Sequence, residues 1–512
     1  MSTNTKTLAI TYQKKTDREH ILDAPDTYIG SIEPDNVKNW IYDEKSESMV
    51  YKEYNWIPGL YKCFDEGIVN ARDHQVRMEQ KISNSEENCI PVKNIDIGIE
   101  KETGIITMIN DGNGIDVAKH PEHDLWIPEM IFGHLRTSTN YDKNEKKIVG
   151  GKNGFGFKLV LIYSKWGKIE TIDHVRGLKY TQEFKDNLSV ICKPSVRKCK
   201  GKPYTKVSWL PDYERFGIPK LTDDMYNLLV KRTYDIAAVT DKLVKVKLNS
   251  SPVPVKTFEK YVDMYVGTKT DTKRVYEQGN ERWEYAVCLT QLDEFTQVSF
   301  VNGIYTSKGG KHVDYILNQI TKKLCDYIEK KKKVSVKPNT IKEQLMLFVN
   351  CVVENPAFDS QTKDYMNTAV SKFGSSCKVS DKFIDKVAKL GVMEQAISIN
   401  ALKQNKQAKK TDGKKTSSVR GIPKLIDANY AGTAKSHQCT LILCEGDSAK
   451  AGIVSGMSRE DRNYYGVYPL KGKLMNVRDA SITKISNNNE FTELKKIVGL
   501  ETNKKYKDAD DV

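Results

Sequence analysis

Hydrophobic and polar positions alternate or repeat at helical spacing along most of the chain. The stretch Asn94–Ile109 alternates apolar and polar residues around Lys101–Gly104, which predicts a β-hairpin. Helical spacing extends over Pro58–Lys81 and over Val313–Lys330. Further strand-like runs are Lys206–Leu210, Tyr285–Leu289 and Val298–Tyr305. Mixed α and β structure is therefore predicted up to about residue 395.

The composition changes after that point. Between Ala401 and Arg420 the basic residues outnumber the acidic ones, with Asp412 as the single acid and almost no apolar residues. This pattern predicts a linker or a mobile basic loop. An apolar strand, Cys439–Cys444, follows and opens another unit. The chain of 512 residues is long enough for about three folding units, and we find no internal repeat.

The net charge of the chain indicates which kind of binding partner it has. Lys and Arg exceed Asp and Glu by 14, which suits a polyanion such as nucleic acid or nucleotide, although solvated surface lysines give the same balance. The 10 cysteines form no C-x-x-C pair and the 8 histidines no H-E-x-x-H, so neither a zinc site nor a disulfide framework is predicted. No apolar run approaches membrane-spanning length, and we expect a soluble, intracellular protein without a membrane partner.

One predicted helix carries polar residues suited to phosphate chemistry. Glu66, Asn70 and Asp73 stand at positions i, i+4 and i+7 and so share a face. A carboxylate and an amide one turn apart can hold a water and a magnesium ion side by side. An ordinary amphipathic helix remains the alternative interpretation of this segment alone.

Two glycine-containing segments follow. In NDGNGI, residues 110–115, Asp111 can accept a hydrogen bond from a buried amino group such as that of adenine, although the string alone could be a simple turn. In GGKNGFGFKL, residues 150–159, backbone N–H groups and Lys158 can cradle phosphate oxygens ahead of an apolar helix, 159–163. The segment lacks the G-K-[ST] ending of a Walker loop.

The order of E-x-x-x-N helix, D-x-G-x-G and glycine-rich segment resembles the GHKL ATPases, which include gyrase, heat-shock 90 chaperones, mismatch-repair ATPases and histidine kinases. The resemblance implies that Glu66 is the general base, Asn70 a magnesium ligand and Asp111 the residue that reads adenine. It also implies nucleotide contacts from this part of the chain by Asn70, Asp73, Asn110, Asp111, Ser138, Thr139, Asn140, Gly151, Lys152, Asn153, Gly154, Phe155, Gly156, Phe157 and Lys158. ATP and Mg²⁺ are the expected substrate and cofactor.

Longer strings resemble the eukaryotic and viral type II topoisomerases. They are DTYIGS (26–31), PEMIFGHLRTSTNYD (128–142), VNGIYTSKGGKHVDYI (301–316), ENPAFDSQTK (354–363) and TLILCEGDSAKAGIVSG (440–456). The implied fold is α/β (α+β): a GHKL ATPase sandwich at 1–245, a ribosomal-protein-like transducer at 246–395, a basic linker at 396–425 and a partial Toprim domain at 426–512. In this family Gln361, Thr362 and Lys363 reach the nucleotide from the transducer, with Lys363 at the γ-phosphate.

Two further sites follow from the same resemblance. A tract of four lysines corresponds to a DNA-contacting loop, although a lysine run is commonly a solvated face. The tract consists of Lys330, Lys331, Lys332 and Lys333. Glu445 matches a Toprim glutamate that holds magnesium for DNA cleavage. The family's second ligand pair, a D-x-D on a later strand, does not occur before Val512, and neither does the tyrosine domain. Departures from the family pattern are Gly67, His74, Asp116 and Phe157.

The resemblance implies an ATP-driven clamp. Two copies would close at their N-terminal domains around double-stranded DNA, with Lys6–Ile21 as a strap that crosses to the partner, and a downstream domain or subunit would supply the catalytic tyrosine. Such a protein would work on DNA, in the nucleus or at a site of viral genome replication. The alternatives are a chaperone or histidine kinase of the GHKL type, a DNA-binding protein with an ATPase-like fold, and the large subunit of a split topoisomerase.

Overall fold

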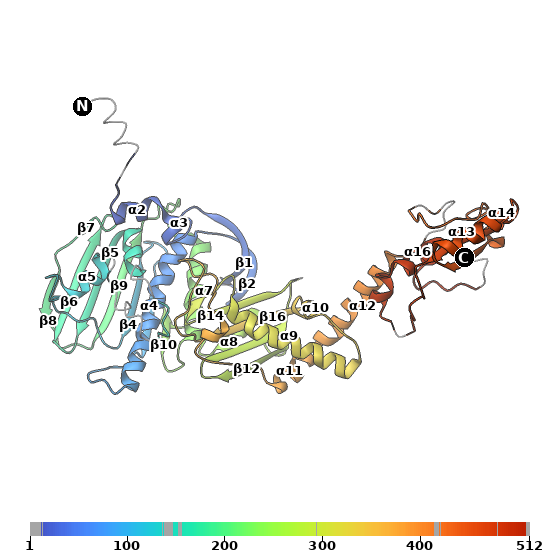
Figure 1. The fold of residues 1–512 in the computed structure, drawn as a ribbon. Coiled ribbons are helices and arrows are strands. Elements are labelled where there is room, and N and C mark those ends of the chain that lie inside the picture. Colours follow the sequence, from blue (N-terminus) through green and yellow to red (C-terminus); the bar gives the residue numbers. More distant parts are fainter. Residues whose placement is uncertain are drawn as a thin grey trace, which may run out of the picture. The chain divides into compact units, whose positions relative to one another are not determined.

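The computed structural model describes residues 12, 14–135, 137, 147–151, 156–292, 294–413, 419, 421–478 and 480–507 (Figure 1). They form two compact units. The first contains the residues up to Lys333 and Lys337–Met393, and the second contains Val334–Val336 and the residues from Glu394 onward. Among the described residues, no helix is both long and apolar enough to cross a membrane.

A nine-stranded sheet dominates the N-terminal part of the first unit. Its order is β11-β10-β3-β4-β9-β5-β6-β7, and β8 pairs with β6. The neighbours are antiparallel except β10 and β3, which are parallel. The bounds are β3 Asn94–Ile99, β4 Ile106–Asp111, β5 Ser164–Asp173, β6 Leu178–Lys185, β7 Val190–Ile191, β8 Ser195–Lys198, β9 Tyr204–Pro211, β10 Lys245–Leu248 and β11 Ser251–Pro252.

Helix α4 (Pro58–Ser83) packs on this sheet against β3 and β4. Pro58 occupies its first turn, where the missing N–H is not needed for helical pairing. Leu60, Phe64 and Ile68 are fully buried, and they form the apolar face that fixes the helix to the sheet. A hairpin of β1 (Asp35–Asp43) and β2 (Ser48–Trp56) packs on helix α7 (Asp223–Val239). The remaining helices of this part are α2 Asp17–Asp23, α3 Pro25–Tyr28, α5 Ile127–Gly133 and α6 Gly156–Ile162.

Close approach of α4 to the sheet explains one unusual residue. A Cβ atom at Gly67 would lie 2.8 Å from Sδ of Met108 and 3.3 Å from the ring of Trp209. A bulkier residue would therefore collide with the sheet. The lower helix propensity of glycine is offset by this fit.

A five-stranded sheet forms the other part of the first unit, in the order β12-β13-β16-β14-β15. Strand β14 runs parallel to β16, and helix α9 lies between them in sequence and packs on β16. The bounds are β12 Arg274–Asn280, β13 Trp283–Leu289, β14 Thr296–Val301, β15 Ile304–Tyr305, β16 Leu345–Cys351, α8 Phe258–Val266, α9 Lys311–Lys332, α10 Pro338–Lys342 and α11 Asp381–Val387. A long loop after β16 carries Lys363.

The second unit contains a β-α-β arrangement. Strands β17 (Thr440–Glu445) and β18 (Tyr465–Leu470) are parallel, and α13 (Gly446–Gly456) connects them. Its other helices are α12 Met393–Lys409, α14 Asp461–Tyr464, α15 Ile482–Ser486 and α16 Asn489–Val498.

Most of the predicted elements are confirmed within a few residues. The helix at Pro58, the hairpin of β3 and β4, strands β9 and β13, helix α9 and strand β17 all coincide with predictions. Two interpretations were wrong. The run Val298–Tyr305 is two strands joined by a turn at Asn302 and Gly303, whose φ angles are 51° and 78°. For the basic stretch Ala401–Arg420 the loop alternative is wrong up to Lys409, because these residues are part of α12. The linker alternative stays a prediction.

Candidate functional site

The polar face of α4 meets the first residue of α6. Glu66 is 4% exposed, and Asn70 is partly exposed one turn later. A Cβ atom at Gly156 would lie 3.2 Å from Oε2 of Glu66 and 3.6 Å from Nδ2 of Asn70. Glycine at the start of α6 therefore lets the backbone after the glycine-rich segment approach both side chains closely.

Asp73, on the same helix, holds the beginning of the glycine-rich segment. Its Oδ1 accepts a hydrogen bond from the N–H of Gly150 at 2.9 Å, and its Oδ2 accepts one from Gly151 at 2.8 Å. Burial raises the pKa of Asp73, against the opposing effects of Arg77 and of these two N–H groups. Both oxygens thus position the start of the segment, and the predicted contact of Asp73 with nucleotide stays a prediction.

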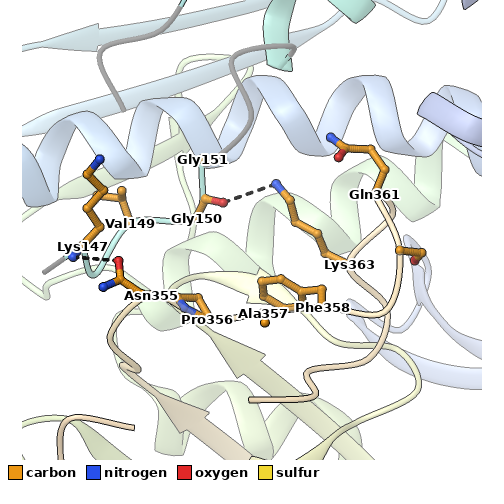
Figure 2. A pocket seen from close by; sticks show the side chains of 11 residues that line it. Lys147, Val149, Gly150, Gly151, Asn355, Pro356, Ala357, Phe358, Gln361 and Lys363 are labelled. Carbon is orange, nitrogen blue, oxygen red and sulfur yellow. Dashed lines mark hydrogen bonds between the residues drawn. The ribbon is translucent and has the colours of Figure 1, made fainter. Parts of the chain in front are cut away.

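Lys363 reaches this site from the loop after β16. Its Nζ lies 3.4 Å from Oε1 of Glu66 and donates to the carbonyl of Gly150 at 3.3 Å, and Figure 2 shows the side chain extending toward Gly150. The residue is 6% exposed and has φ 63°, an uncommon backbone conformation for a side chain of this size. The structure thus brings Glu66 and Lys363 into contact, and their shared contact with the γ-phosphate stays a prediction.

A cavity of about 170 Å³ lies between the loop and the segment before α6. It is lined by Lys147, Val149, Gly150, Gly151, Asn355, Pro356, Ala357, Phe358, Ser360, Gln361 and Lys363 (Figure 2). Asn355 ties its two walls together, because its N–H donates to the carbonyl of Lys147 at 2.8 Å and its Oδ1 accepts from the N–H of Lys147 at 3.2 Å. Gln361 lines the cavity, whereas Thr362 donates its hydroxyl to Asp364.

A second lysine also contacts the carboxylate of Glu66. Nζ of Lys62 lies 2.8 Å from the same Oε1 atom and 3.3 Å from Oδ2 of Asp65. Burial alone would raise the pKa of Glu66, but the attraction of Lys363 and Lys62 outweighs it and lowers the pKa below its usual value. Glu66 is therefore ionised at neutral pH and can accept hydrogen bonds from a water molecule.

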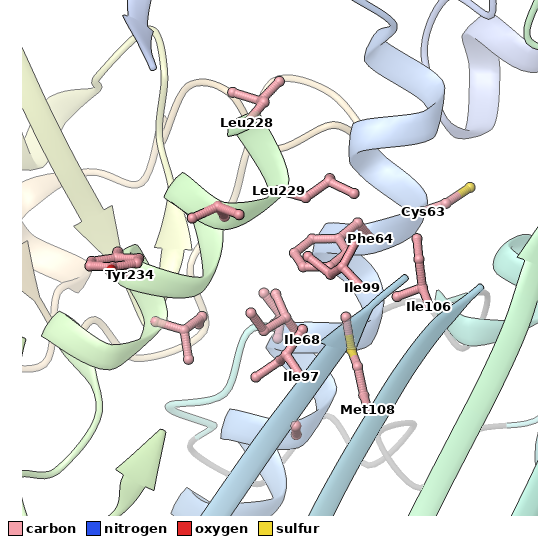
Figure 3. Close-up of a cluster of buried hydrophobic side chains, with 14 of the residues drawn as sticks. Cys63, Phe64, Ile68, Ile97, Ile99, Ile106, Met108, Leu228, Leu229 and Tyr234 are labelled. Carbon is pink, nitrogen blue, oxygen red and sulfur yellow. The ribbon is translucent and has the colours of Figure 1, made fainter. Parts of the chain in front are cut away.

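Adjacent residues at the end of β4 face opposite sides of the sheet. Asn110 shares the buried face with Ile106 and Met108, whose side chains point toward α4 in Figure 3. Asp111 points the other way: its Oδ1 accepts from the N–H groups of Lys93 and Asn94, and its Oδ2 accepts from Nδ2 of Asn94. The carboxylate thus fixes the start of β3. Nδ2 of Asn110 donates to the carbonyl of Asp111 at 3.1 Å. The predicted contact of Asp111 with adenine stays a prediction.

Helix α6 turns two predicted nucleotide contacts inward. Phe157 is 8% exposed and packs edge-on against Phe132 and Trp209, with ring centroids 5.4 Å apart in each pair. Its side chain therefore belongs to the core, and only its backbone can face a ligand. Lys158 donates to the carbonyl of Thr137 at 2.6 Å, and burial lowers its pKa to about 8.

Known proteins resemble the chain over most of its length. It is 46% identical to a DNA topoisomerase 2 of Arabidopsis thaliana over 98% of this chain and 34% of that protein. It is 45% identical to a DNA topoisomerase 2 of Acanthamoeba polyphaga mimivirus over 99% of this chain and 40% of that protein. The crystal structure of the ATPase region of Saccharomyces cerevisiae topoisomerase II matches with a TM-score of 0.71 and 40% identity, covering 77% of this chain and 99% of that chain.

The chain belongs to the type II DNA topoisomerase family. It spans about a third of the length of the curated relatives, 34% and 40% in the two cases above. The family described as DNA gyrase B matches residues 257–417. The predicted α/β fold class is confirmed by the match to the solved ATPase region. The chaperone and histidine-kinase alternatives are excluded by this membership.

Several residues predicted from the topoisomerase resemblance lie outside the described residues. They are Ser138, Thr139, Asn140, Lys152, Asn153, Gly154, Phe155 and the strap residues 6–11 and 13. The described end of the strap packs on its own chain. Ile21 is fully buried there, and Arg18 donates to the carbonyl of Asn187 at 3.2 Å.

The four lysines of the predicted DNA-binding tract lie at the C-terminal end of α9. Lys330, Lys331 and Lys332 form its last turn and Lys333 caps it, and all four are exposed. The tract is therefore helical up to Lys332, whereas the resemblance implied a loop. Cations also stabilise a helix C-terminus, so the place of Lys331 and its neighbours has a structural explanation as well. Their contact with DNA stays a prediction.

The predicted metal residue of the second unit is also exposed. Glu445 ends β17, at the carboxyl edge of a parallel strand pair. That position leaves its carboxylate open to a divalent ion. The metal site itself stays a prediction.

A separate group of metal-ligating side chains lies on the loop between β4 and α5. One ligand atom each of His120, Glu122 and His123 lies within 4.8 Å of the others, and the two histidine rings stack 4.7 Å apart. Nδ1 of His120 accepts a hydrogen bond from the N–H of Glu122. The trio is largely exposed and has no part in the contacts around Glu66.

Sequence reasoning missed the residues that support the site from within the core. Arg232 is fully buried, and its Nε lies 2.7 Å from Oδ1 of Asp65. Lys62 was missed although its i, i+4 spacing to Glu66 is visible in the sequence. The pairing of Arg232 with Asp65 joins positions 167 residues apart and has no local signal.

Proposed function

We propose that this chain is the ATP-hydrolysing part of a type II topoisomerase. The observation that carries the proposal is the contact of Lys363 with Glu66, between positions 297 residues apart. A carboxylate that orients water and a cation that stabilises the transferring phosphoryl group must flank the same phosphate. The two groups meet beside the glycine-rich segment, where a triphosphate would lie.

Glu66 orients the attacking water in this proposal. Its lowered pKa keeps the carboxylate ionised, and its Oε2 faces Gly156 at the edge of the segment. Lys363 would exchange its contact with Glu66 for the γ-phosphate. Glu66 would then lose one of its two cations and become a stronger base at the moment when its water is in place.

Asn70 is the candidate ligand for Mg²⁺. The amide oxygen suits a hard cation that also binds phosphate oxygens and water. Asn70 lies one turn after Glu66 on α4, and both side chains approach Gly156, the first residue of α6. The residues present therefore fit the ion. When bound, Mg²⁺ neutralises charge on the β- and γ-phosphates. By binding the ion, Asn70 would position the triphosphate relative to the carboxylate of Glu66.

The remaining nucleotide contacts come from β4 and α6. Asp111 is the candidate reader of adenine, as the resemblance implies, and Asn110, on the buried face of β4, is a further candidate contact. Lys158 is buried with a lowered pKa, so an anionic phosphate would favour its charged form. In this proposal the glycine-rich segment is the phosphate lid that covers the triphosphate. Asp73 binds Gly150 and Gly151 and would keep the base of this phosphate lid in place.

Steady-state ATP hydrolysis by Glu66→Gln and Lys363→Met tests the proposal. We expect Glu66→Gln to lower kcat by about 10²- to 10⁴-fold, which is the usual contribution of a general base. Binding of a non-hydrolysable ATP analogue should persist in this variant. Lys308→Met, at a lysine side chain that is 70% exposed, is the matched control and should hydrolyse at the parental rate. Parental rates in the Glu66 and Lys363 variants would refute the proposal.

The complete enzyme would use this hydrolysis for double-strand passage. In the proposal two copies close around double-stranded DNA at their N-terminal domains, Lys330–Lys333 contact its backbone, and Glu445 contributes to a Mg²⁺ site for cleavage. The protein would then work on DNA in the nucleus or at a site of viral genome replication. Plasmid relaxation with ATP tests this part: we expect none from this chain alone and relaxation when the downstream polypeptide with the catalytic tyrosine is added.

A further inference from the structure

Lys62 is a buried lysine one turn before Glu66. In the proposed ATP hydrolysis it contacts neither the nucleotide nor the attacking water. It is 2% exposed. Burial would lower its pKa, but Glu66 and Asp65 outweigh that effect and raise the pKa, so the ammonium is charged. Taking such a group out of water is costly, and a buried ion pair is a weak source of stability. The lysine must therefore be explained by what it does to its partners.

The contacts of Glu66 divide between its two oxygens. Lys62 and Lys363 both approach Oε1, at 2.8 Å and 3.4 Å. Oε2 faces Gly156, toward the glycine-rich segment. When Lys363 turns to a phosphate, Lys62 is the cation that stays on Oε1. Its ammonium then keeps the carboxylate plane fixed with Oε2 directed at the nucleotide.

A chain of buried charges continues from Lys62 to the second sheet. Asp65 accepts from Lys62 at 3.3 Å and from Nε of Arg232 at 2.7 Å. Nη2 of Arg232 donates to the carbonyl of Gly303 at 2.8 Å. Gly303 lies in the turn between β14 and β15. The ammonium that holds Glu66 is thus itself held by the turn of another sheet.

The same turn also holds the base of the loop that carries Lys363. Asn302 donates from Nδ2 to the carbonyl of Val353 at 2.9 Å, and its Oδ1 accepts from the N–H of Val353 at 2.8 Å. Asn302 is fully buried. The turn 302–303 is therefore the common support of Glu66, through Lys62, and of the loop with Lys363, through Val353.

We propose that Lys62 is a positioning residue for the catalytic base, and that Asp65 and Arg232 tie it to the turn 302–303, which sets Glu66 and Lys363 in register. This inference rests on the proposed ATPase function. It predicts that Lys62 acts on the chemical step rather than on nucleotide affinity. Movement of the turn would then change the hydrolysis rate without any contact with the nucleotide.

The test compares Lys62→Met and Lys62→Gln with Lys81→Met, a half-exposed lysine on the same helix, as the matched control. We expect Lys62→Met to lower kcat by about 10- to 100-fold, which a misplaced catalytic group produces. KM and the Kd of a non-hydrolysable ATP analogue should stay within about threefold. The acid limb of the pH profile should move to higher pH, because the loss of Lys62 raises the pKa of Glu66. Lys62→Gln, which can still donate to Oε1, should recover part of the rate.

A double variant separates positioning from a general structural defect. In the Glu66→Gln background the carboxylate is gone, so adding Lys62→Met should lower the residual rate no further. Two results would overturn the inference. One is that Lys62→Met lowers kcat in the Glu66→Gln background as much as it does in the parent. The other is that Lys62→Met alone keeps the parental kcat and the parental acid limb of the pH profile. If Glu66→Gln itself keeps the parental rate, the proposed function fails instead. Binding of the non-hydrolysable ATP analogue shows that a variant is folded. If Lys62→Met does not fold, the kcat and the pH profile of Lys62→Gln are compared with the parent instead.

Discussion

Replacement of Asp73 by Asn should loosen the phosphate lid without removing any group that reacts. The carboxylate accepts two backbone hydrogen bonds, from Gly150 and Gly151 at 2.9 and 2.8 Å. Asn can accept only one of them and must turn its NH₂ group toward the other N–H. A hydrogen bond to a charged group is worth about 1.5–3 kcal/mol. Burial already raises the pKa of Asp73, so removing its charge recovers part of that cost.

The net weakening of the lid should therefore be smaller, about 1–2 kcal/mol, which raises the Kd of a nucleotide about 5- to 30-fold. Titration with a fluorescent ATP analogue measures this, and hydrogen exchange at the two glycine amides should accelerate in parallel. Asp43→Asn is the matched control, because Asp43 also accepts from a backbone N–H and a hydroxyl, both of Ser46, but on the surface. An unchanged Kd with slow glycine exchange in Asp73→Asn would refute the role in the lid.

Three other outcomes are expected. Binding of a triphosphate should raise the pKa of Lys158 from about 8, so the protein should take up protons on binding near pH 8. Calorimetry in buffers of different ionisation enthalpy measures this uptake. The variant Lys158→Met should abolish it. Gly67→Ala should lose about 1 kcal/mol in chemical denaturation, since overpacking against Met108 exceeds the gain in helix propensity, whereas Gly452→Ala, with open space around it, should stabilise α13. Replacing Lys330–Lys333 with Gln should reduce the salt dependence of duplex binding by about 0.9 in slope for each lysine on a phosphate, as measured by anisotropy.

Local patterns were sufficient where one face of an element is buried. Helix α4 follows from its apolar spacing and from Pro58, and the hairpin of β3 and β4 follows from strict alternation. The same alternation already separates Asn110 from Asp111, since Ile106 and Met108 set the inward face. The register does not decide which of the two residues contacts adenine, and the assignment of Asp111 from the motif stays a prediction.

Long-range contacts were beyond the reach of the pattern. The first unit brings Arg232 to Asp65 and Lys363 to Glu66 across 167 and 297 positions. Resemblance supplied the second pair, but no spacing signals the first. The basic stretch before Lys409 shows the opposite error: its lack of an apolar face suggested a loop, yet its Ala, Leu, Gln and Lys residues are strong helix formers, and they form α12.

The ion-paired side chains at the centre of the site also carry unequal charge. Lys62, Arg232 and Lys363 are cations, whereas Asp65 and Glu66 are the anions that they contact. All five are nearly buried, so a surplus of positive charge there is weakly screened. A triphosphate placed beside Lys363 would neutralise it and would release Glu66 from one of its partners. The net positive charge of this cluster thus favours binding of the anionic triphosphate. Lys363 can move from Glu66 to the phosphate without leaving a buried, unpaired carboxylate, because Lys62 remains on the same oxygen.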